Sequence, residues 1–128
     1  MKKMILLLLA MMLLTACGQD KGNSQEAVYV NITAQDAKEI MDSQEGYIIL
    51  DTRTQEEFEE SHIPGAILIP HNEITEKAET VLTDKGQLIL VYCRSGRRSK
   101  LAAEDLVKLG YTNIKEFGGI IAWPYEVE

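Results

Sequence analysis

The sequence predicts an α/β domain in which helices cover both faces of a parallel sheet. Short apolar runs rich in Ile, Leu and Val alternate along the chain with segments whose apolar residues recur at helical spacing. Two of these runs, 47–51 and 88–92, are almost entirely apolar, as expected of strands that are buried on both faces. Alternation of this kind is typical of parallel sheets, in which ligands bind beyond the carboxyl ends of the strands.

The domain begins with a predicted strand over 28–32 and a helix that follows it directly. Thr33 and Asp36 have the spacing of a capping box, in which each side chain bonds the other residue's backbone N–H. The helix is therefore predicted to run from this box to about Met41. Residues 47–51 form the second predicted strand, which is a buried one.

A second helix and a third strand follow in the same order. Thr54 and Glu57 repeat the capping-box spacing and predict a short helix that ends near Ser61. A Pro-Gly turn precedes the third predicted strand, 66–69. Pro70 stops this strand, because proline has no N–H to offer a sheet.

The fourth predicted strand ends at a cysteine. Asn72 is predicted to cap the preceding helix, which runs to about Val81, and the strand over 88–92 leads directly to Cys93. The next five residues, Arg-Ser-Gly-Arg-Arg, hold three cations and no carboxylate, although the chain's formal net charge is -7. Cations beside a thiol favour the thiolate, and a glycine-containing loop before a helix presents N–H donors to an anion. The pattern predicts a nucleophilic Cys93 beside an anion-binding loop, and a merely buried, inert cysteine is the alternative.

The last predicted elements complete the alternation. A helix is expected to run from Ser99 to Gly110, with one apolar face made of Leu101, Ala102, Leu106 and Leu109. A fifth strand is predicted over 114–117. It is followed by two glycines and an apolar turn around Trp123.

The first 16 residues have the pattern of a secretion signal. Two lysines open it, residues 5–14 form its apolar stretch, and this stretch is too short to span a membrane. Leu-Thr-Ala-Cys-Gly at 14–18 resembles the bacterial lipoprotein signal. That resemblance implies cleavage before Cys17, a diacylglycerol on its sulfur and often an acyl chain such as palmitate on the new amino terminus, and such chains together anchor a protein stably. An ordinary signal peptide with an incidental Cys17 is the alternative.

We therefore predict a signal peptide over 1–16, a lipidated cysteine with a flexible tether over 17–26, and one domain over 27–128. The protein is expected outside the cytoplasm, held to the bacterial cell membrane only by lipid on Cys17. Cleavage would make the acidic chain more acidic still, which argues against binding to nucleic acid or, through charge, to anionic lipid. Two histidines and one remaining thiol lack metal-ligand spacing, so neither a metal site nor a cofactor is expected.

Four separated blocks of the sequence resemble the single-domain rhodanese (sulfurtransferase) pattern in order and spacing. The blocks are Asp51-Thr52-Arg53 with Glu57-Phe58, His62 to Ala66, Cys93 to Ser99, and Gly118-Gly119 with Trp123. Together they cover nearly everything after the tether. The resemblance implies a rhodanese-like, five-stranded parallel sheet flanked by helices, with a Cys93 that accepts a sulfane sulfur as a persulfide.

This resemblance implies roles for each residue of the loop. Cys93 would attack the outer sulfur of a donor such as thiosulfate and release sulfite. The expected substrate site consists of Arg94, Ser95, Gly96, Arg97, Arg98 and Ser99, whose backbone N–H groups would hold the persulfide. Arg94 would attract the anionic donor, Arg98 would either do the same or tie the loop to a carboxylate, and Arg97 is expected to be a solvated charge.

The acceptor of the sulfur is expected to be external. Once Cys17 is lipidated, Cys93 is the only thiol of the mature chain, so no internal cysteine can receive the sulfur. Cyanide would serve as the acceptor in an assay, and a small thiol or a partner protein would serve in the cell.

Two other classes of protein use a similar loop. A cysteine-dependent phosphatase or arsenate reductase usually spaces its arginine as C-x5-R, whereas Cys93 and Arg98 form C-x4-R, and the loop itself carries no acid to protonate a leaving group. The other alternative is a non-catalytic rhodanese-like module that brings partners to the membrane. The intact cysteine loop argues against it, and sulfur uptake by the purified domain distinguishes the two.

The remaining residues of the blocks are expected to be structural. Asp51 and Arg53 would brace the loops at the strand ends, and Glu57 would cap its helix. The resemblance places His62 in a turn-forming segment, which favours a hydrogen-bonded structural histidine over a base for the cysteine. Trp123 is expected in the core.

Overall fold

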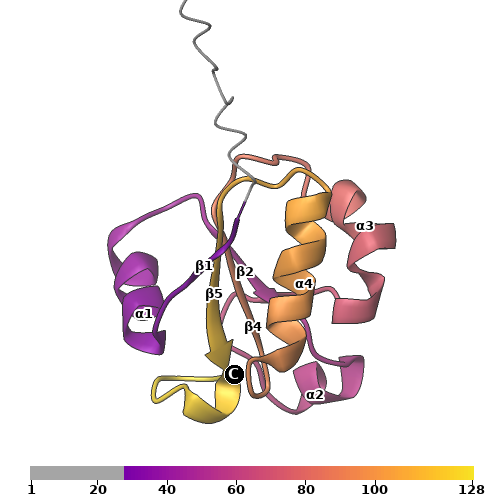
Figure 1. Ribbon diagram of the computed structural model, residues 1–128. Coiled ribbons are helices and arrows are strands. Elements are labelled where there is room, and N and C mark those ends of the chain that lie inside the picture. Colours follow the sequence, from indigo (N-terminus) through magenta and orange to yellow (C-terminus); the bar gives the residue numbers. More distant parts are fainter. Residues whose placement is uncertain (1–27) are drawn as a thin grey trace, which may run out of the picture.

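The computed structural model describes residues 28–128, and in this range the chain forms a five-stranded parallel sheet (Figure 1). The strands lie in the order β1-β5-β4-β2-β3, and each neighbouring pair runs parallel. Their bounds are β1 Val30–Asn31, β2 Ile48–Asp51, β3 Ile67–Leu68, β4 Ile89–Cys93 and β5 Ile114–Gly119. The predicted α/β class and the five parallel strands are confirmed.

Helices cover both faces of this sheet. Their bounds are α1 Ala34–Ser43, α2 Gln55–Glu60, α3 Ile74–Val81 and α4 Arg97–Lys108, with short 3-10 turns η1 His71–Glu73 and η2 Ile120–Ala122. Helix α1 lies on one face of the sheet, and α3 and α4 lie side by side on the other (Figure 1). This covering on both sides is what a parallel sheet of apolar strands requires.

The apolar residues of β4 alternate between two cores. Ile89 and Val91 pack with α3 and α4, whereas Leu90 and Tyr92 pack with α1 and the C-terminal segment. Cys93 contacts Ser99 of α4, at the carboxyl end of a central strand. The period of two along a strand therefore places the cysteine under the first turn of α4.

Both predicted capping boxes are present. Thr33 Oγ1 accepts from Asp36 N–H at 3.0 Å, and Thr33 N–H donates to Asp36 Oδ2 at 3.3 Å. Thr54 Oγ1 accepts from Glu57 N–H at 3.2 Å, and Thr54 N–H donates to Glu57 Oε1 at 3.4 Å. These local signals place the starts of α1 and α2 correctly.

Two helix starts differ from the prediction. Asn72 is not a cap but lies inside η1, where Glu73 N–H donates to Pro70 O at 2.8 Å, and α3 begins only at Ile74. Helix α4 begins at Arg97 rather than Ser99, because Gly96, at φ 106°, turns the chain directly into the helix. Two of the three arginines predicted in the loop therefore belong to the first turn of α4.

The edge strands β1 and β3 have two residues each and are shorter than predicted, because an edge strand pairs on one side only. Strand β5 runs two residues further than predicted, to Gly119. Within 28–128, no helix is both long and apolar enough to cross a bilayer. The predicted signal peptide, Cys17 and the tether lie outside the described residues.

Candidate active site

The side chain of Cys93 is enclosed where β4 meets α4. The residue is 0% exposed, and its Sγ accepts the N–H of Gly96 at 2.9 Å. Ser99 Oγ lies 3.3 Å from the same sulfur. Two polar groups from the loop and the helix therefore face the one atom that the sequence predicts to be nucleophilic.

Gly96 is required at the bend between the strand and the helix. Its φ of 106° lies in the left-handed region, which a side chain disfavours. The N–H groups of the three residues that follow have no acceptor inside α4, because they belong to its first turn. This helix start offers partial positive charge at the place where the cysteine ends the strand.

The end of β5 holds the other side of the loop. A Cβ on Gly119 would lie 1.9 Å from Arg94 O, so only glycine allows the two backbones to lie this close. The N–H of Ile121 donates to the same carbonyl at 3.2 Å. This contact explains why the end of β5 needs a glycine at position 119, although this position lies 25 residues after Arg94 in the sequence.

The three arginines have different surroundings. The Arg98 guanidinium forms a fork on Glu57 of α2, with Nη1 2.6 Å from Oε1 and Nη2 2.9 Å from Oε2. Of the two arrangements expected for Arg98, the structure thus shows the one that ties the loop to a carboxylate. Arg97 is exposed, as expected, and Arg94 is exposed beside the loop.

The pairing of Arg98 with Glu57 keeps both groups charged. The hydrogen bonds from Arg98, together with its positive charge, lower the pKa of Glu57 from 4.5 to about 2 against the opposing effect of burial. The hydrogen bond with Glu57 also raises the pKa of Arg98, and the nearby Cys93 adds a smaller contribution. The guanidinium therefore lies within the electrostatic reach of the cysteine while a carboxylate holds it in place.

A cleft of about 320 Å³ adjoins the loop. It is lined by Arg53, Glu57, Glu60, Arg94, Ile120 and Ile121. Arg94 presents a cation to it and the two isoleucines give it an apolar wall. The fold also brings two carboxylates to this cleft, which could not be seen from the loop sequence alone, and Glu57 stays ionised at neutral pH because of its low pKa.

A buried network braces the strand ends next to the cleft. Arg53 Nη2 lies 2.7 Å from Asp51 Oδ2 and donates to Ser61 O at 2.6 Å. The Tyr92 hydroxyl donates to the same carboxylate at 2.7 Å, and burial followed by this hydrogen bond raises the pKa of Tyr92. The bracing role predicted for Asp51 and Arg53 is confirmed.

His62 has the structural environment that was predicted. Its Nδ1 lies 2.9 Å from Phe58 O, and its ring stacks on that of Phe58 with centroids 3.9 Å apart. Its Nε2 lies 3.3 Å from Glu128 Oε1. These contacts hold the turn after α2 against the end of the chain.

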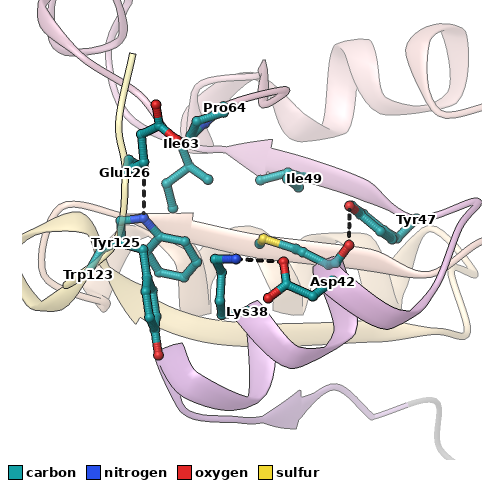
Figure 2. A pocket seen from close by; sticks show the side chains of 10 residues that line it. Lys38, Asp42, Tyr47, Ile49, Ile63, Pro64, Trp123, Tyr125 and Glu126 are labelled. Carbon is teal, nitrogen blue, oxygen red and sulfur yellow. Dashed lines mark hydrogen bonds and ion pairs between the residues drawn. The ribbon is translucent and has the colours of Figure 1, made fainter.

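Trp123 is a core residue, and it also borders a second hollow on the α1 side of the sheet (Figure 2). This hollow has a volume of about 210 Å³, and its lining includes Lys38, Tyr47 and Tyr125. The Trp123 Nε1–H donates to Glu126 O at 3.1 Å. The hollow shares no lining residue with the cleft beside Arg94, so the two are separate features.

Sequence reasoning also missed Glu116 of β5, a polar residue of the site. It is 2% exposed, and its Oε1 accepts from Ser99 Oγ at 2.7 Å and from Gly118 N–H at 2.8 Å. The signal available in the sequence was an acid inside a predicted strand, shortly before the glycine pair. Within the described range, no cluster of three or more His, Cys, Asp or Glu side chains is placed to hold a metal ion.

Comparison with known proteins agrees with this geometry. The family model of the rhodanese-like domain matches residues 33–124. Thiosulfate sulfurtransferase PspE of Escherichia coli is 40% identical over 77 residues, which are 59% of this chain and 74% of PspE. The chloroplastic thiosulfate sulfurtransferase 16 of Arabidopsis thaliana is 38% identical over 89 residues, covering 61% of this chain and 74% of that protein.

Solved structures give the same result. A rhodanese with anions from E. coli superimposes with a TM-score of 0.60 at 34% identity, covering 64% of this chain and 96% of that one. The chain also matches longer relatives, of which it spans about half or less. The matched range contains the cysteine loop, the bracing network and the glycine pair. This chain therefore belongs to the rhodanese-like family and is an enzyme of the rhodanese sulfurtransferase type.

Proposed function

We propose that this chain is an extracytoplasmic, membrane-anchored sulfurtransferase that carries a sulfane sulfur from thiosulfate or a similar anionic donor as a persulfide on Cys93. The observation that carries the proposal is the surroundings of Sγ, which faces the Gly96 N–H at 2.9 Å and Ser99 Oγ at 3.3 Å. Donors of this kind stabilise a thiolate, and the cation of Arg94 in the adjoining cleft suits an anionic donor.

The first half-reaction needs no acid. The Cys93 thiolate attacks the outer sulfur of thiosulfate, and a bond forms between Sγ and that sulfur. The bond between the two sulfur atoms of the donor breaks, and its electron pair leaves with sulfite, which is stable as an anion. The terminal sulfur of the persulfide then carries the negative charge, which the first-turn N–H groups of α4 are placed to stabilise.

The burial of Cys93 adds a conformational step to this proposal. Its side chain is 0% exposed, so a donor reaches Sγ only after residues 94–96 shift outward. Arg94 and Ser95 are exposed, and the cleft lies beside them, so this short segment is the part of the enclosure that faces solvent. We therefore expect binding of the donor to be coupled to a small movement of the loop.

The second half-reaction uses an external acceptor. Cys93 is the free cysteine of the described part of the chain. A nucleophile attacks the terminal sulfur, the Sγ–S bond breaks, and Sγ keeps the electron pair as a thiolate. Cyanide gives thiocyanate, and a thiolate gives a new persulfide. In the cell the acceptor is then a small thiol or a partner protein.

The location is the part of the proposal that rests on sequence alone. The pattern at 14–18 supports lipidation of Cys17 and anchoring outside the cytoplasm. Replacing Cys17 with Ala is expected to abolish lipid labelling and to release the protein from the membrane fraction, whereas Cys93→Ser retains both. A Cys17→Ala chain that keeps its label and its membrane binding would exclude the anchor.

Intact mass spectrometry tests the chemistry. After exposure to thiosulfate, the wild-type chain should gain the mass of one sulfur atom, and Cys93→Ser should not. The circular dichroism and the unfolding midpoint of the variant should match those of the wild type, and aryl phosphates should not be hydrolysed by either. Sulfur transfer by Cys93→Ser at the wild-type rate, or phosphatase activity without persulfide formation, would show that the proposal is wrong.

A further inference from the structure

Glu116 is a buried carboxylate at the active site without a cationic partner. It is 2% exposed in the middle of β5, and the ion pairs found among residues 28–128 all involve other carboxylates. Its Oε1 accepts hydrogen bonds from Ser99 Oγ at 2.7 Å and from Gly118 N–H at 2.8 Å. Buried carboxylates are usually paired with a cation, because an isolated charge is costly to remove from water. The persulfide chemistry described above gives this carboxylate no role.

The Ser99 hydroxyl joins this carboxylate to the reacting sulfur. Ser99 Oγ lies 2.7 Å from Glu116 Oε1 and 3.3 Å from Cys93 Sγ. The hydroxyl also lies 3.1 Å from Gly96 O and 3.4 Å from Gly118 O, which are acceptors only. A hydroxyl donates one proton, so it can satisfy only one of these neighbours as a donor.

Two arrangements join the three groups in one chain of hydrogen bonds through the Ser99 hydroxyl. In the first, Ser99 donates to an ionised Glu116, and its oxygen accepts from Cys93, which is then a thiol. If Ser99 donates to a Cys93 thiolate, the 2.7 Å contact between Oγ and Oε1 needs another proton, and only a protonated Glu116 can supply it. The two arrangements differ by the transfer of one proton from sulfur to carboxylate through the hydroxyl.

We propose that Glu116 is a positioning residue that takes up the proton of Cys93 through Ser99 when the thiolate forms. The Sγ–H bond breaks as an Oγ–H bond forms, and the original hydroxyl proton moves to Oε1, so no electrons are gained or lost. The buried pair carries a single negative charge before and after the transfer. When the sulfur has left for its acceptor, the reverse transfer restores the thiol. This inference rests on the proposed persulfide chemistry at Cys93.

The groups around the pair suit such a transfer. Tyr29, before β1, is a titratable group near Glu116, and burial together with the charges of Glu104 and Glu116 raises its pKa. From α4, Arg98 lies within electrostatic reach of the sulfur, but both of its terminal nitrogens are bonded to Glu57. Tyr29 and Arg98 therefore keep their own protons, so neither takes up the proton of Cys93 in place of Glu116.

The test is the pH dependence of Cys93 alkylation by iodoacetamide in the full chain. The label is counted on the tryptic peptide 86–94, which excludes Cys17. In the wild type, the Cys93–Glu116 pair holds one proton over an intermediate pH range, and within that range the fraction of thiolate does not depend on pH. A plot of the alkylation rate against pH should therefore show two rising steps separated by a plateau. Glu116→Gln should show a single step, with the rate falling about tenfold per pH unit below its midpoint and no plateau.

Two further variants make the outcome decisive. Ser99→Ala removes the hydroxyl that bonds both groups in their singly protonated state, so it should narrow the pH range of the plateau, and it serves even where Glu116→Gln fails to fold. Glu104→Gln removes another nearby charge that also acts on Tyr29, and it should keep the plateau. A Glu116 that shares no proton with Cys93 would leave the wild type with a single step, which Glu116→Gln would displace without removing any plateau.

A plateau that is missing from the wild type, that survives in Glu116→Gln, or that keeps its full pH range in Ser99→Ala overturns the inference. Alkylation does not require sulfur transfer, so the two proposals fail separately. A plateau in a chain that takes up no sulfur would refute the persulfide chemistry and leave the proton transfer standing.

Discussion

Replacing Gly119 with Ala should displace the cysteine loop and leave the rest of the fold in place. The new Cβ would lie 1.9 Å from Arg94 O, 2.3 Å from Arg94 C and 2.5 Å from Ser95 N, all of them backbone atoms. Because real contacts of this kind stay beyond 3.0 Å, the peptide after Cys93 must move by about 1 Å. A displacement of that size at reacting groups costs about a hundredfold in rate, and the overpacking costs about 1–3 kcal/mol of stability.

The assay is thiocyanate formation from thiosulfate and cyanide, with urea unfolding followed by the fluorescence of the single tryptophan. We expect kcat/KM of Gly119→Ala to fall about a hundredfold while the variant remains folded. Gly86→Ala is the matched control, since its Cβ would meet Asp84 Oδ1 at an ordinary 3.5 Å and it precedes β4, whereas the loop follows this strand. A Gly119→Ala chain with wild-type kcat/KM would refute the reasoning that this close approach positions the cysteine loop.

Three further variants test the surroundings of the site. Glu57→Gln should be about 1 kcal/mol less stable than the wild type at pH 7, a modest value because the ion pair is partly exposed. The pKa of Glu57 in the folded protein, about 2, lies below the usual 4.5, so this difference in stability is complete above pH 4.5 and should vanish as the pH falls through 2. Urea unfolding that shows the same difference at every pH would contradict this prediction. Arg94→Gln should raise KM for thiosulfate about tenfold with little change in kcat, whereas Lys100→Gln should change neither, and steady-state kinetics would exclude the role if kcat alone fell. Tyr92→Phe leaves the buried Asp51 without one hydrogen bond and should cost about 1–3 kcal/mol in urea unfolding, and an unchanged midpoint would show that this bond is not needed.

Local patterns in the sequence were enough for the fold class and for the place of Cys93 at the end of a buried strand. The capping boxes at Thr33 and Thr54 act over three residues, so they could be recognised without knowing the partners of α1 and α2. The apolar composition of the run before Cys93 likewise indicates a buried strand without knowledge of its neighbours. The start of α3 was predicted wrongly because asparagine is a common helix cap, whereas Asn72 lies inside the 3-10 turn that follows Pro70.

Lipidation of Cys17 and the location of the protein stay predictions from sequence. Their residues lie before the described range, and a lipoprotein signal is a short local pattern that the fold of 28–128 neither supports nor opposes.

By itself, the sequence determined the alternation of strands and helices, the cysteine at the end of β4 and the cationic loop, because each of these depends on residues close together in the chain. Only the tertiary structure decided that Glu57 holds Arg98 from 41 positions away and that Gly119 touches the carbonyl of Arg94. The same holds for Glu116, which meets Ser99 from 17 positions away. The physical reason is that a parallel sheet gathers the carboxyl ends of distant strands at one edge, and no pattern within a single segment records which side chains meet there.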